Sequence, residues 1–572
     1  MLSMLHLRID VNTVSVEFMG TKDILESYDE IDDVRQINDD AFFISLFEKQ
    51  FLLLLPSAQD PASEMEVWLY NDEFLDYPHV MLRECRIEKE QPYPKGTYRA
   101  VCLYEQESVV HSLIPYEEKI TDCIDRLIEI LSMNKFQREQ EFHKEFMFYW
   151  NNQSEKNPRY HVYLQQDTAF TELDVYFGNN SIRLIDHCLA LSDLANREKG
   201  ERVWTHHFEN EAFYIPITDL REILPPHRGY KWTDKDLINI IYGKQINHID
   251  DDSFEKLKTL IPKSQNIILV FGMKISQTMV AFAMKVKCRN GSGHTLIDKI
   301  LYDIQDIEPL NTERKDFLWL CEQIGNDICL KDKRILIVGA GSLGSYVSFE
   351  LVKNGAKTID IFDDDKLEEE NILRWSYGGL GKGSNKACTL QALLNLIHPE
   401  INIVSHSKKL NATALIENLS SSDLLIFTIG NSDEQLRFNR LLKEAKCSIP
   451  VLFAWLEEGG TFSHILYVNY QQKGCFECLY TNYDGVLVNN RASKNTDEKA
   501  RKSIIRNGCG GTRAAYGTAI LLRTTAALLD IIRDVENHVI SQSTLYDVTP
   551  QGIEVSNTTL HMERCCCCGS QR

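Results

Sequence analysis

The stretch that decides the fold is Ile335-Leu336-Ile337-Val338-Gly339-Ala340-Gly341-Ser342-Leu343-Gly344. Its apolar start predicts a short buried strand, and residues 342–353 after it have a helical pattern. Gly339, Gly341 and Gly344 permit a tight turn and let the backbone approach a phosphate group closely. The N-terminus of the helix adds N–H donors and positive potential. This stretch therefore predicts a phosphate-binding turn between a strand and a helix.

The chain after about residue 315 alternates between strand-like and helix-like segments. Short apolar runs predict the strands, and amphipathic stretches between them predict the helices. Such a series forms βαβ units, and we therefore expect an α/β fold with a mainly parallel sheet. The expected strands are residues 335–338, 358–362, 403–405, 424–428 and 451–455.

Asp363 lies nineteen residues past Gly344, at the end of the next expected strand. A carboxylate at this position is well placed to bind the hydroxyl groups of a ribose. The pattern up to this point fits an NAD-dependent oxidoreductase equally well, and a glycine-rich turn that binds no ligand is a further alternative.

The residues that follow favour a triphosphate. Asn371, Arg374 and Lys386 come in order after Asp363, within segments rich in acidic residues and glycine. Hydride transfer needs no such set, whereas an adenylyltransferase must neutralise a triphosphate and the pyrophosphate that leaves. Arginine, lysine and Mg²⁺ suit that task.

The order G-x-G-x-x-G, D-x-D, N-x-x-R, G-x-x-K resembles the ThiF/MoeB/ubiquitin-activating superfamily. In this sequence these motifs are residues 339–344, 363–365, 371–374 and 383–386. The resemblance covers roughly residues 315–572 and implies a Rossmann-like adenylation domain, which we place at residues 317–572. It also implies ATP as the nucleotide.

Residue by residue, the resemblance assigns Asp363 to the ribose and places Asp365 in the ATP site. Asn371 and Arg374 are implied to contact the phosphates, and Lys386 the α- and β-phosphates. Arg374 and Lys386 are accordingly expected to act in catalysis.

The magnesium ligand departs from the pattern of this superfamily. Relatives place an aspartate for Mg²⁺ in a T-D-N sequence, whereas this chain reads Thr428-Ile429-Gly430-Asn431. Asp433 or Asp365 is expected to substitute for the missing aspartate.

Two C-x-x-C pairs stand far apart in the sequence. Cys475 and Cys478 form the first, and Cys565 and Cys568 the outer positions of a run of four cysteines. Four thiolates at this spacing suit a tetrahedral Zn²⁺ that joins distant segments. The superfamily commonly carries such a site; a metal-free terminal tail and a shifted register within the run are the alternatives.

Cys509 lies between glycines, in Asn507-Gly508-Cys509-Gly510-Gly511-Thr512-Arg513, just before an apolar helical stretch at 516–532. A helix N-terminus and nearby arginines lower the pKa of a thiol, which favours a reactive thiolate. The position resembles the thioester cysteine of autophagy-type and bacterial activating enzymes. The alternative is a buried cysteine that caps the helix.

The chain before residue 317 has two zones. Residues 1–150 show short apolar runs spaced by Asp, Pro and Gly, followed by helical patterns at 120–131 and 136–150. This is typical of an α+β domain with an antiparallel meander. Residues 151–316 contain further strand-like runs, including a hairpin at 267–286, and we interpret them as a mixed middle domain that serves as a scaffold.

The first zone resembles a ubiquitin-conjugating enzyme around Cys102. Gly96 and Cys102-Leu103 match the G-x-x-C-L neighbourhood of the family loosely, and helices follow in a similar order. The His-Pro-Asn tripeptide of that family is absent, and Tyr77-Pro78-His79 is only faintly similar to the turn before it. The resemblance makes Cys102 a candidate transfer cysteine; a strand core residue is the alternative.

The succession of conjugating-like, middle and adenylation domains is similar to the all-in-one fusion enzyme of bacterial CBASS anti-phage operons. That resemblance implies ATP-dependent activation of a partner's C-terminus, a thioester and transfer to an amine of a target protein. The implied partner is a ubiquitin-like protein or a cyclic-oligonucleotide synthase with a C-terminal glycine. The alternatives are a stand-alone activating enzyme with a non-catalytic N-terminal domain, a sulfur-carrier adenylyltransferase, and a docking protein without turnover.

Charge and hydropathy exclude other classes. A formal net charge of −21 opposes binding to nucleic acid or anionic membranes. We find no apolar run long enough for a membrane span and no signal peptide, and we expect a cytoplasmic protein. Arg314 lies where relatives send an arginine into the partner subunit's active site, which predicts a homodimer.

Overall fold

The sheet of the C-terminal region is built around β16 (Arg334–Val338), the strand that leads into the glycine-rich turn. In the computed structural model of the chain, the strand order is β18-β17-β16-β19-β20-β21-β24-β25. The strands from β18 to β20 pair in parallel, and those from β20 to β25 pair antiparallel. The expected strand–helix alternation with a parallel sheet is confirmed, and an antiparallel extension completes it. The other strands are β17 (Thr358–Phe362), β18 (Asn402–His406), β19 (Leu424–Phe427), β20 (Val451–Leu456), β21 (Ser463–Val468), β24 (Thr544–Thr549) and β25 (Gly552–Asn557).

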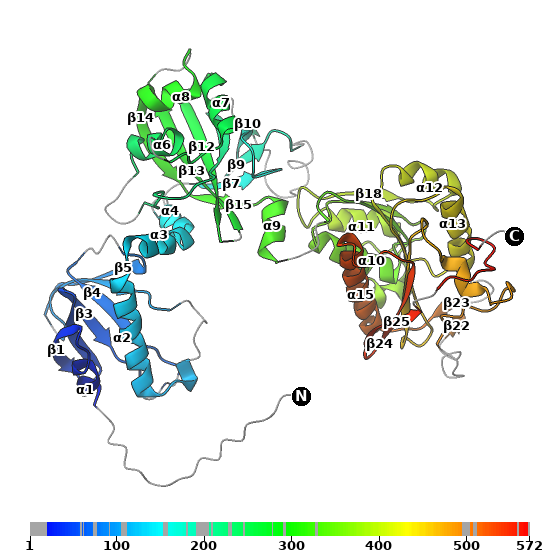
Figure 1. Cartoon of the computed structure of the whole chain (residues 1–572), viewed down its shortest axis with the longest axis horizontal. Helices are drawn as coiled ribbons and strands as arrows, with labels where there is room; N and C mark the ends of the chain where they lie inside the picture. Colours follow the sequence, from blue (N-terminus) through cyan, green and yellow to red (C-terminus); the bar gives the residue numbers. More distant parts are fainter. Residues whose placement is uncertain are drawn as a thin grey trace, which may run out of the picture. The chain divides into compact units, whose positions relative to one another are not determined.

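Helices cover both faces of this sheet (Figure 1). Alternate residues of β16 point to opposite sides: Ile335 and Ile337 belong to one apolar core, and Leu336 and Val338 to the other. Burial on both faces explains why the strand is an unbroken apolar run. The first core contains α10 (Ser342–Lys353) and α15 (Thr518–Glu536), and the second contains α12 (Ala412–Leu419) and α13 (Ser432–Glu444). Remaining helical elements of this region are α9 (Phe317–Gln323), η3 (Glu369–Arg374), α11 (Lys386–Leu394) and η4 (Phe476–Tyr480).

The structure describes most of the chain in two compact units. The described residues are 20–569, apart from 58–59, 61, 73–76, 91, 105–110, 153–157, 179–180, 190–204, 207–209, 227–231, 244–245, 277, 290–292, 326–329, 495–503, 507–511 and 558–559. One unit comprises residues 1–158 and 213–312, and the other comprises residues 159–212 and 313–572. The expected middle zone at 151–316 is therefore divided between the two units, and the boundaries 1–150, 151–316 and 317–572 remain a prediction.

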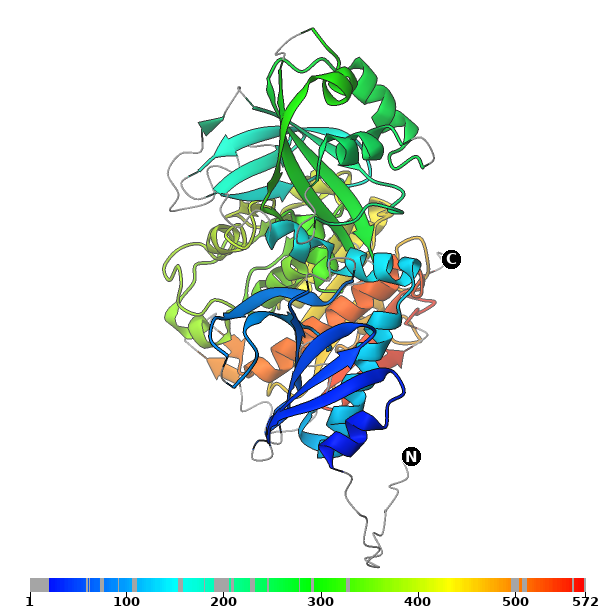
Figure 2. The ribbon, with the colours of Figure 1, turned by 90° about the vertical axis from the view of Figure 1, so that its left-hand side faces the viewer.

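The N-terminal sheet is an antiparallel array with one helix against it. Its order is β1-β2-β3-β4-β6-β5, and α2 (Tyr116–Ser132) lies against the strands (Figures 1 and 2). Ile120, Ile124 and Leu127 of α2 share a core with residues of β2 and β3. The expected meander and the helix at 120–131 are thus observed. The strands are β1 (Ile31–Asn38), β2 (Ala41–Leu46), β3 (Lys49–Leu54), β4 (Glu66–Tyr70), β5 (Val80–Ile87) and β6 (Gly96–Val101); α1 (Thr21–Glu26) precedes them and η1 (His111–Leu113) precedes α2.

The helical pattern at 136–150 forms two helices, α3 (Lys135–Lys144) and α4 (Phe146–Asn152). The break falls at Glu145, whose backbone leaves the helical conformation at φ −97° and ψ 10°. Its carboxylate lies 3.2 Å from Nδ1 of His79. In α4, Trp150 packs on Phe282 of β13 with ring centroids 4.6 Å apart and donates a hydrogen bond to the carbonyl of Leu310.

The remaining part of the first unit contains the hairpin that the sequence predicts. Strands β12 (Asn266–Ile275) and β13 (Thr278–Cys288) pair in antiparallel register, and β14 (Ile304–Leu310) continues the sheet beside β13. This part also contains α6 (Asp234–Ile241), α7 (Asp251–Thr259), α8 (Leu296–Asp298) and η2 (Lys299–Asp303).

In the second unit, β7 (Arg159–Tyr163) pairs in parallel with β9 (Ser181–Asp186), and β8 (Thr171–Phe177) pairs antiparallel with β9. The N–H of Lys315 donates to the carbonyl of Val162, which ties β7 to the chain just before α9. Further strands of this unit are β10 (Thr205–His206), β22 (Ile504–Arg506) and β23 (Thr512–Ala514), whereas β11 (Asn210–Pro216) and β15 (Thr312–Arg314) each contain a boundary between the two units. Within the described residues, none of the helices combines the length and the apolar character that crossing a bilayer requires.

Candidate functional site

The glycine-rich turn joins β16 to α10, and two of its glycines are required by the backbone itself. A Cβ on Gly344 would lie 1.9 Å from the carbonyl oxygen of Gly339, so no larger residue fits. Gly339 has φ +104°, a conformation that glycine adopts without strain. Gly341 differs, because a Cβ there would meet nothing within 4 Å. It therefore leaves open space for a ligand close to the backbone.

Asp363 directly follows β17 and holds the turn. Its Oδ2 accepts a hydrogen bond of 2.7 Å from the N–H of Ala340, and its Oδ1 accepts one of 2.8 Å from the N–H of Asp365. Burial raises the pKa of Asp363 above its ordinary value, against the effect of these hydrogen bonds. A carboxylate oxygen has room for a second donor, so a ribose hydroxyl remains compatible with this geometry.

Asn371 and Arg374 reach the site on η3, which a tryptophan ties to the glycine-rich turn. The indole Nε1 of Trp375 donates a 2.9 Å hydrogen bond to the carbonyl of Ala340, inside the core. The guanidinium of Arg374 lies over the ring of Tyr516, 5.3 Å from its centroid. The hydrogen bond of Trp375 therefore places the end of η3 beside the glycine-rich turn, although about thirty residues separate the two in sequence.

Lys386 is the first residue of α11 and is largely buried. Its Nζ lies 2.9 Å from Oδ2 of Asp365, whose side chain is mostly exposed. The side chain of Asn385 donates to the carbonyl oxygens of Asp363 and Asp365, which fixes the start of the helix beneath this pair. A phosphate group would compete with the Asp365 carboxylate for the ammonium group.

A cavity of about 590 Å³ brings four of the predicted site residues together, whereas Asp363 and Asp365 are not among its lining residues. Gly341, Asn371, Arg374 and Lys386 all line it, and so does Tyr516. The volume is in the range of small-molecule sites, and the cations Arg374 and Lys386 suit an anionic ligand. The cavity thus fits a nucleotide triphosphate.

The magnesium ligand is less defined. Gly430 and Asn431 line the cavity where relatives carry the aspartate, and the side chain of Asn431 caps α13. Asp433 lies on the exposed first turn of α13 and is not among the lining residues. Carboxylate oxygens of residues 363–365 lie within 4.8 Å of one another. A magnesium role for Asp433 or Asp365 stays a prediction.

The cysteine pairs meet in a compact cluster. The sulfurs of Cys475, Cys478, Cys565 and Cys568 lie within 4.8 Å of one another, with Sγ–Sγ distances of 4.0, 3.8 and 3.3 Å for the pairs 475–478, 475–565 and 478–568. Tetrahedral zinc with Zn–S bonds of ~2.3 Å places sulfurs ~3.8 Å apart. The donor set therefore fits Zn²⁺.

The neighbours of this cluster agree with the expected register. Cys566 is exposed, and the sulfur of Cys567 accepts a hydrogen bond from the side chain of Asn439. The cluster also shapes the cavity wall, because Phe476 and Tyr480 of η4 line the cavity beside it. The sequence motifs gave no indication of these two aromatic residues beyond their position next to Cys475 and Cys478.

The expected nucleophile Cys509 lies outside the described residues. Strands β22 and β23 on either side of it pair antiparallel. Tyr516 lines the cavity and directly precedes Gly517, the N-cap of α15, so this helix begins near the candidate nucleotide site.

Cys102 lies just past the end of β6 in the first unit and is half-buried. Its thiol lies 3.4 Å from the carbonyl oxygen of Tyr104, and its N–H donates to the carbonyl of His79. The His79 imidazole lies between Glu141 and Glu145, at 3.4 and 3.2 Å. Whether Cys102 carries an acyl group stays a prediction.

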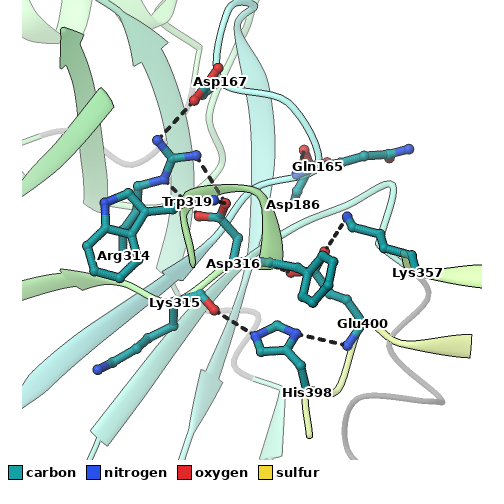
Figure 3. A network of polar contacts seen from close by, with 11 residues as sticks. Gln165, Asp167, Asp186, Arg314, Lys315, Asp316, Trp319, Lys357, His398 and Glu400 are labelled. Carbon is teal, nitrogen blue, oxygen red and sulfur yellow. Dashed lines mark hydrogen bonds and ion pairs between the residues drawn. The ribbon is translucent and has the colours of Figure 1, made fainter. Parts of the chain in front are cut away.

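Arg314 occupies a different environment from the one the sequence suggested (Figure 3). Its guanidinium lies between the carboxylates of Asp167 and Asp316, at 2.9 and 2.8 Å, and its side chain is only 2% exposed. Nearby, His398 bridges the carbonyl of Lys315 and the N–H of Glu400. Because Arg314 is buried against acids of its own chain, it does not extend toward a partner subunit as expected. The position of Arg314 therefore does not support a homodimer.

Comparison with known proteins agrees with the C-terminal assignment. Residues 324–566 match the ThiF family. The chain is 25% identical over 189 residues to ubiquitin-like modifier-activating enzyme 5 of Drosophila simulans, which covers 30% of this chain and 43% of that protein. It is 30% identical over 179 residues to the ATP-dependent ubiquitin transferase-like protein Cap2 of Pseudomonas aeruginosa, covering 30% and 32%.

Among solved structures, the crystal structure of E. coli MccB with ATP aligns with a TM-score of 0.32 and 18% identity, covering 42% of this chain and 68% of that one. The chain matches less than half the length of the activating enzyme and of the transferase-like protein Cap2. Residues 324–566 are the part of the chain that is similar to the ThiF family.

Proposed function

We propose that this chain uses ATP to activate the C-terminal carboxylate of a ubiquitin-like or otherwise tailed partner protein. The observation that carries the proposal is the single cavity lined by Gly341, Asn371, Arg374 and Lys386. Two cations beside a glycine-rich turn at a helix N-terminus suit a triphosphate better than they suit hydride transfer. The names of the relatives, an activating enzyme and a transferase-like protein, support the same class.

The proposed first step is adenylation. A carboxylate oxygen of the partner attacks the α-phosphorus of ATP, and the bond to the bridging oxygen breaks as pyrophosphate leaves. Arg374 and Lys386 stabilise the negative charge that moves onto the leaving group. Lys386 exchanges its ion pair with Asp365 for the phosphates. Asp363 receives the ribose and Asn371 contacts the phosphates in this proposal.

The proposed second step forms a thioester. The thiolate of Cys509 attacks the acyl carbon of the adenylate, and AMP leaves with the electron pair of the broken C–O bond. The start of α15 beside the cavity supports this, because Cys509 lies only eight residues before the N-cap Gly517. The loss of a thiol-sensitive adduct in Cys509→Ala tests the step; an adduct that persists assigns the nucleophile elsewhere.

The proposed third step transfers the acyl group to Cys102 and then to an amine of a target protein. Its support is the partial exposure of Cys102 and the resemblance of its domain to conjugating enzymes. In the setting of anti-phage defence, the activated partner is a cyclic-oligonucleotide synthase with a C-terminal glycine. Cys102→Ala should abolish conjugation and spare the Cys509 adduct; unchanged conjugation would reduce the domain to a scaffold.

Zinc has a structural role in this proposal. Four thiolates leave no open coordination position, so the ion would tie η4 to the C-terminal segment without taking part in the reaction. Magnesium would enter with the nucleotide and neutralise part of its charge.

ATP–pyrophosphate exchange tests the first step. The purified chain is assayed with a candidate partner that ends in glycine, such as one encoded beside its gene. Lys386→Ala should reduce exchange by ~100-fold or more, because it removes a preorganised charge. Lys382→Ala is the matched control, since this lysine is exposed and pairs with Glu369. Equal losses in both variants would contradict the assignment of Lys386.

A further inference from the structure

A buried charged cluster lies beside the candidate nucleotide cavity and belongs to none of the motifs described above. His464 of β21 is completely buried. Its Nδ1 lies 2.8 Å from Oδ1 of Asp547 on β24, and its Nε2 lies 2.7 Å from Oε1 of Glu457, which follows β20. The side chains of both acids are only 5% exposed.

This geometry favours a charged imidazole. Ionised carboxylates only accept hydrogen bonds, and a neutral imidazole has a single N–H. With both ring nitrogens beside ionised carboxylates, a positively charged His464 can donate a hydrogen bond to each of them. The ammonium group of Lys494 and its backbone N–H also contact these two acids. Removing one member of a buried, hydrogen-bonded charge pair is costly, because its partner loses part of its electrostatic compensation.

The cluster holds residues 490–494 at one end. The ammonium group of Lys494 lies 3.0 Å from Oδ2 of Asp547, and its backbone N–H donates a 2.7 Å hydrogen bond to Oε1 of Glu457. Near the other end, the guanidinium of Arg491 donates to the carbonyl of Cys478. Asn490 lines the cavity. The segment is therefore fixed between the charged cluster and the cysteine cluster.

The cluster also contacts the cavity wall directly. The ring of Trp455 lies 5.1 Å from that of His464, and Trp455 lines the cavity. Glu458, the neighbour of Glu457 in the chain, lines it as well. Three lining residues are thus connected to the cluster. Trp455 contacts the ring of His464, Glu458 follows Glu457 in the chain, and Asn490 belongs to the segment that ends at Lys494.

We propose that Glu457, His464 and Asp547 are positioning residues that hold residues 490–494, and with them Asn490, Trp455 and Glu458, against the nucleotide cavity. They hold the segment through their contacts with Lys494. The part of this inference that concerns nucleotide affinity rests on the proposed function; the part that concerns the segment does not.

Limited proteolysis tests the segment by itself. Trypsin cleaves after Lys494, and mass spectrometry follows that cut at native conditions. In His464→Gln the cut should be about tenfold faster, because breaking a buried charged set lowers the local stability of the segment. His406→Gln is the matched control: His406 pairs with Asp360 at 3.2 Å elsewhere on the same sheet. An unchanged rate after Lys494, or an equal rise in the control, overturns the proposal.

Binding of a fluorescent ATP analogue with Mg²⁺ provides the second measurement. Lys494→Met leaves the buried residues intact and alters a side chain that is 44% exposed, so it is expected to fold even where His464→Gln does not. The Kd should rise about fivefold in Lys494→Met and should stay unchanged in Lys446→Met, whose side chain belongs to no part of the site. An unaltered Kd in Lys494→Met overturns the link to the cavity. If the wild-type chain does not bind the analogue, the proposed function fails, and proteolysis still decides the role of the cluster.

Discussion

Substitution by alanine should have different effects at Gly341 and at Gly344. At Gly344 it should lower the stability of the turn, whereas at Gly341 it should lower the affinity for the nucleotide. In Gly344→Ala the new methyl group would lie 1.9 Å from the Gly339 carbonyl oxygen and 2.7 Å from Oγ1 of Thr428. The turn must shift to relieve both contacts, which should lower the free energy of unfolding by about 1–3 kcal/mol, as overpacking does in other cores.

Gly341→Ala adds a methyl group with nothing within 4 Å of it, at φ −70° and ψ −156°, which alanine adopts readily. Its free energy of unfolding should therefore match the wild type or exceed it by about 0.4–1 kcal/mol, because alanine restricts the unfolded chain. The methyl group would nevertheless occupy the place where a phosphate approaches the backbone. We expect the affinity for ATP to fall at least ~10-fold, which corresponds to ~1.4 kcal/mol.

Urea unfolding followed by circular dichroism gives the stabilities, and titration with a fluorescent ATP analogue gives the affinities. Together, the stability and the affinity distinguish a variant whose turn is distorted from one in which the ligand is sterically excluded. If Gly341→Ala binds the analogue like the wild type, a phosphate does not approach the backbone at residue 341. A stable Gly344→Ala protein would contradict the geometry of the turn itself.

Three further predictions concern the cysteine cluster, the charged cluster and the buried arginine. The chain should contain about one zinc per molecule by elemental analysis, and Cys565→Ser should lose the metal and melt at lower temperature while the exposed Cys566→Ser retains both. Burial would lower the pKa of His464, but the hydrogen bonds that its ring donates to the two carboxylates raise the pKa above its ordinary value. The stabilisation by this histidine is therefore complete below pH ~6.5 and is lost as the pH rises through the folded-state pKa. The difference in free energy of unfolding between wild type and His464→Gln should shrink over that range, and a difference that grows with pH would reverse the assigned charge. Arg314→Ala should lower the free energy of unfolding by about 3–5 kcal/mol because it removes the guanidinium that pairs with two buried carboxylates, and a neutral effect in urea unfolding would mean that the guanidinium is not enclosed.

Local sequence patterns predicted the elements next to the site well. The strand 335–338 and the helix 342–353 follow from a run buried on both faces and from glycines that the turn requires, and β16 and α10 match them closely. The antiparallel strands beyond β20 were not predicted, and one of their pairings, β21 with β24, joins segments about 75 residues apart in the chain. Pairing over such a distance depends on tertiary packing and leaves little local signal.

Some of the residues that line the cavity could be predicted from the sequence, and others could not. Asn371, Arg374 and Lys386 could be predicted, since their residue types and order indicate phosphate chemistry. Tyr480 and Asn490 could not be predicted, because they come from η4 and from a loop of ordinary composition, neither of which carries a phosphate-binding motif. The role expected of Arg314 failed for a related reason: its acidic partner Asp167 is distant in sequence, so its burial is invisible to local inspection.

ATP–pyrophosphate exchange in three proteins tests the central proposal most directly. With a tailed partner present, the wild-type chain should exchange label between pyrophosphate and ATP, and Lys386→Ala should lose this activity by ~100-fold or more. Cys509→Ala should keep it, because the thiol acts only after pyrophosphate has left. Exchange that survives in Lys386→Ala, or that is lost in Cys509→Ala while ATP still binds, would contradict an adenylation step at this cavity that precedes the thioester.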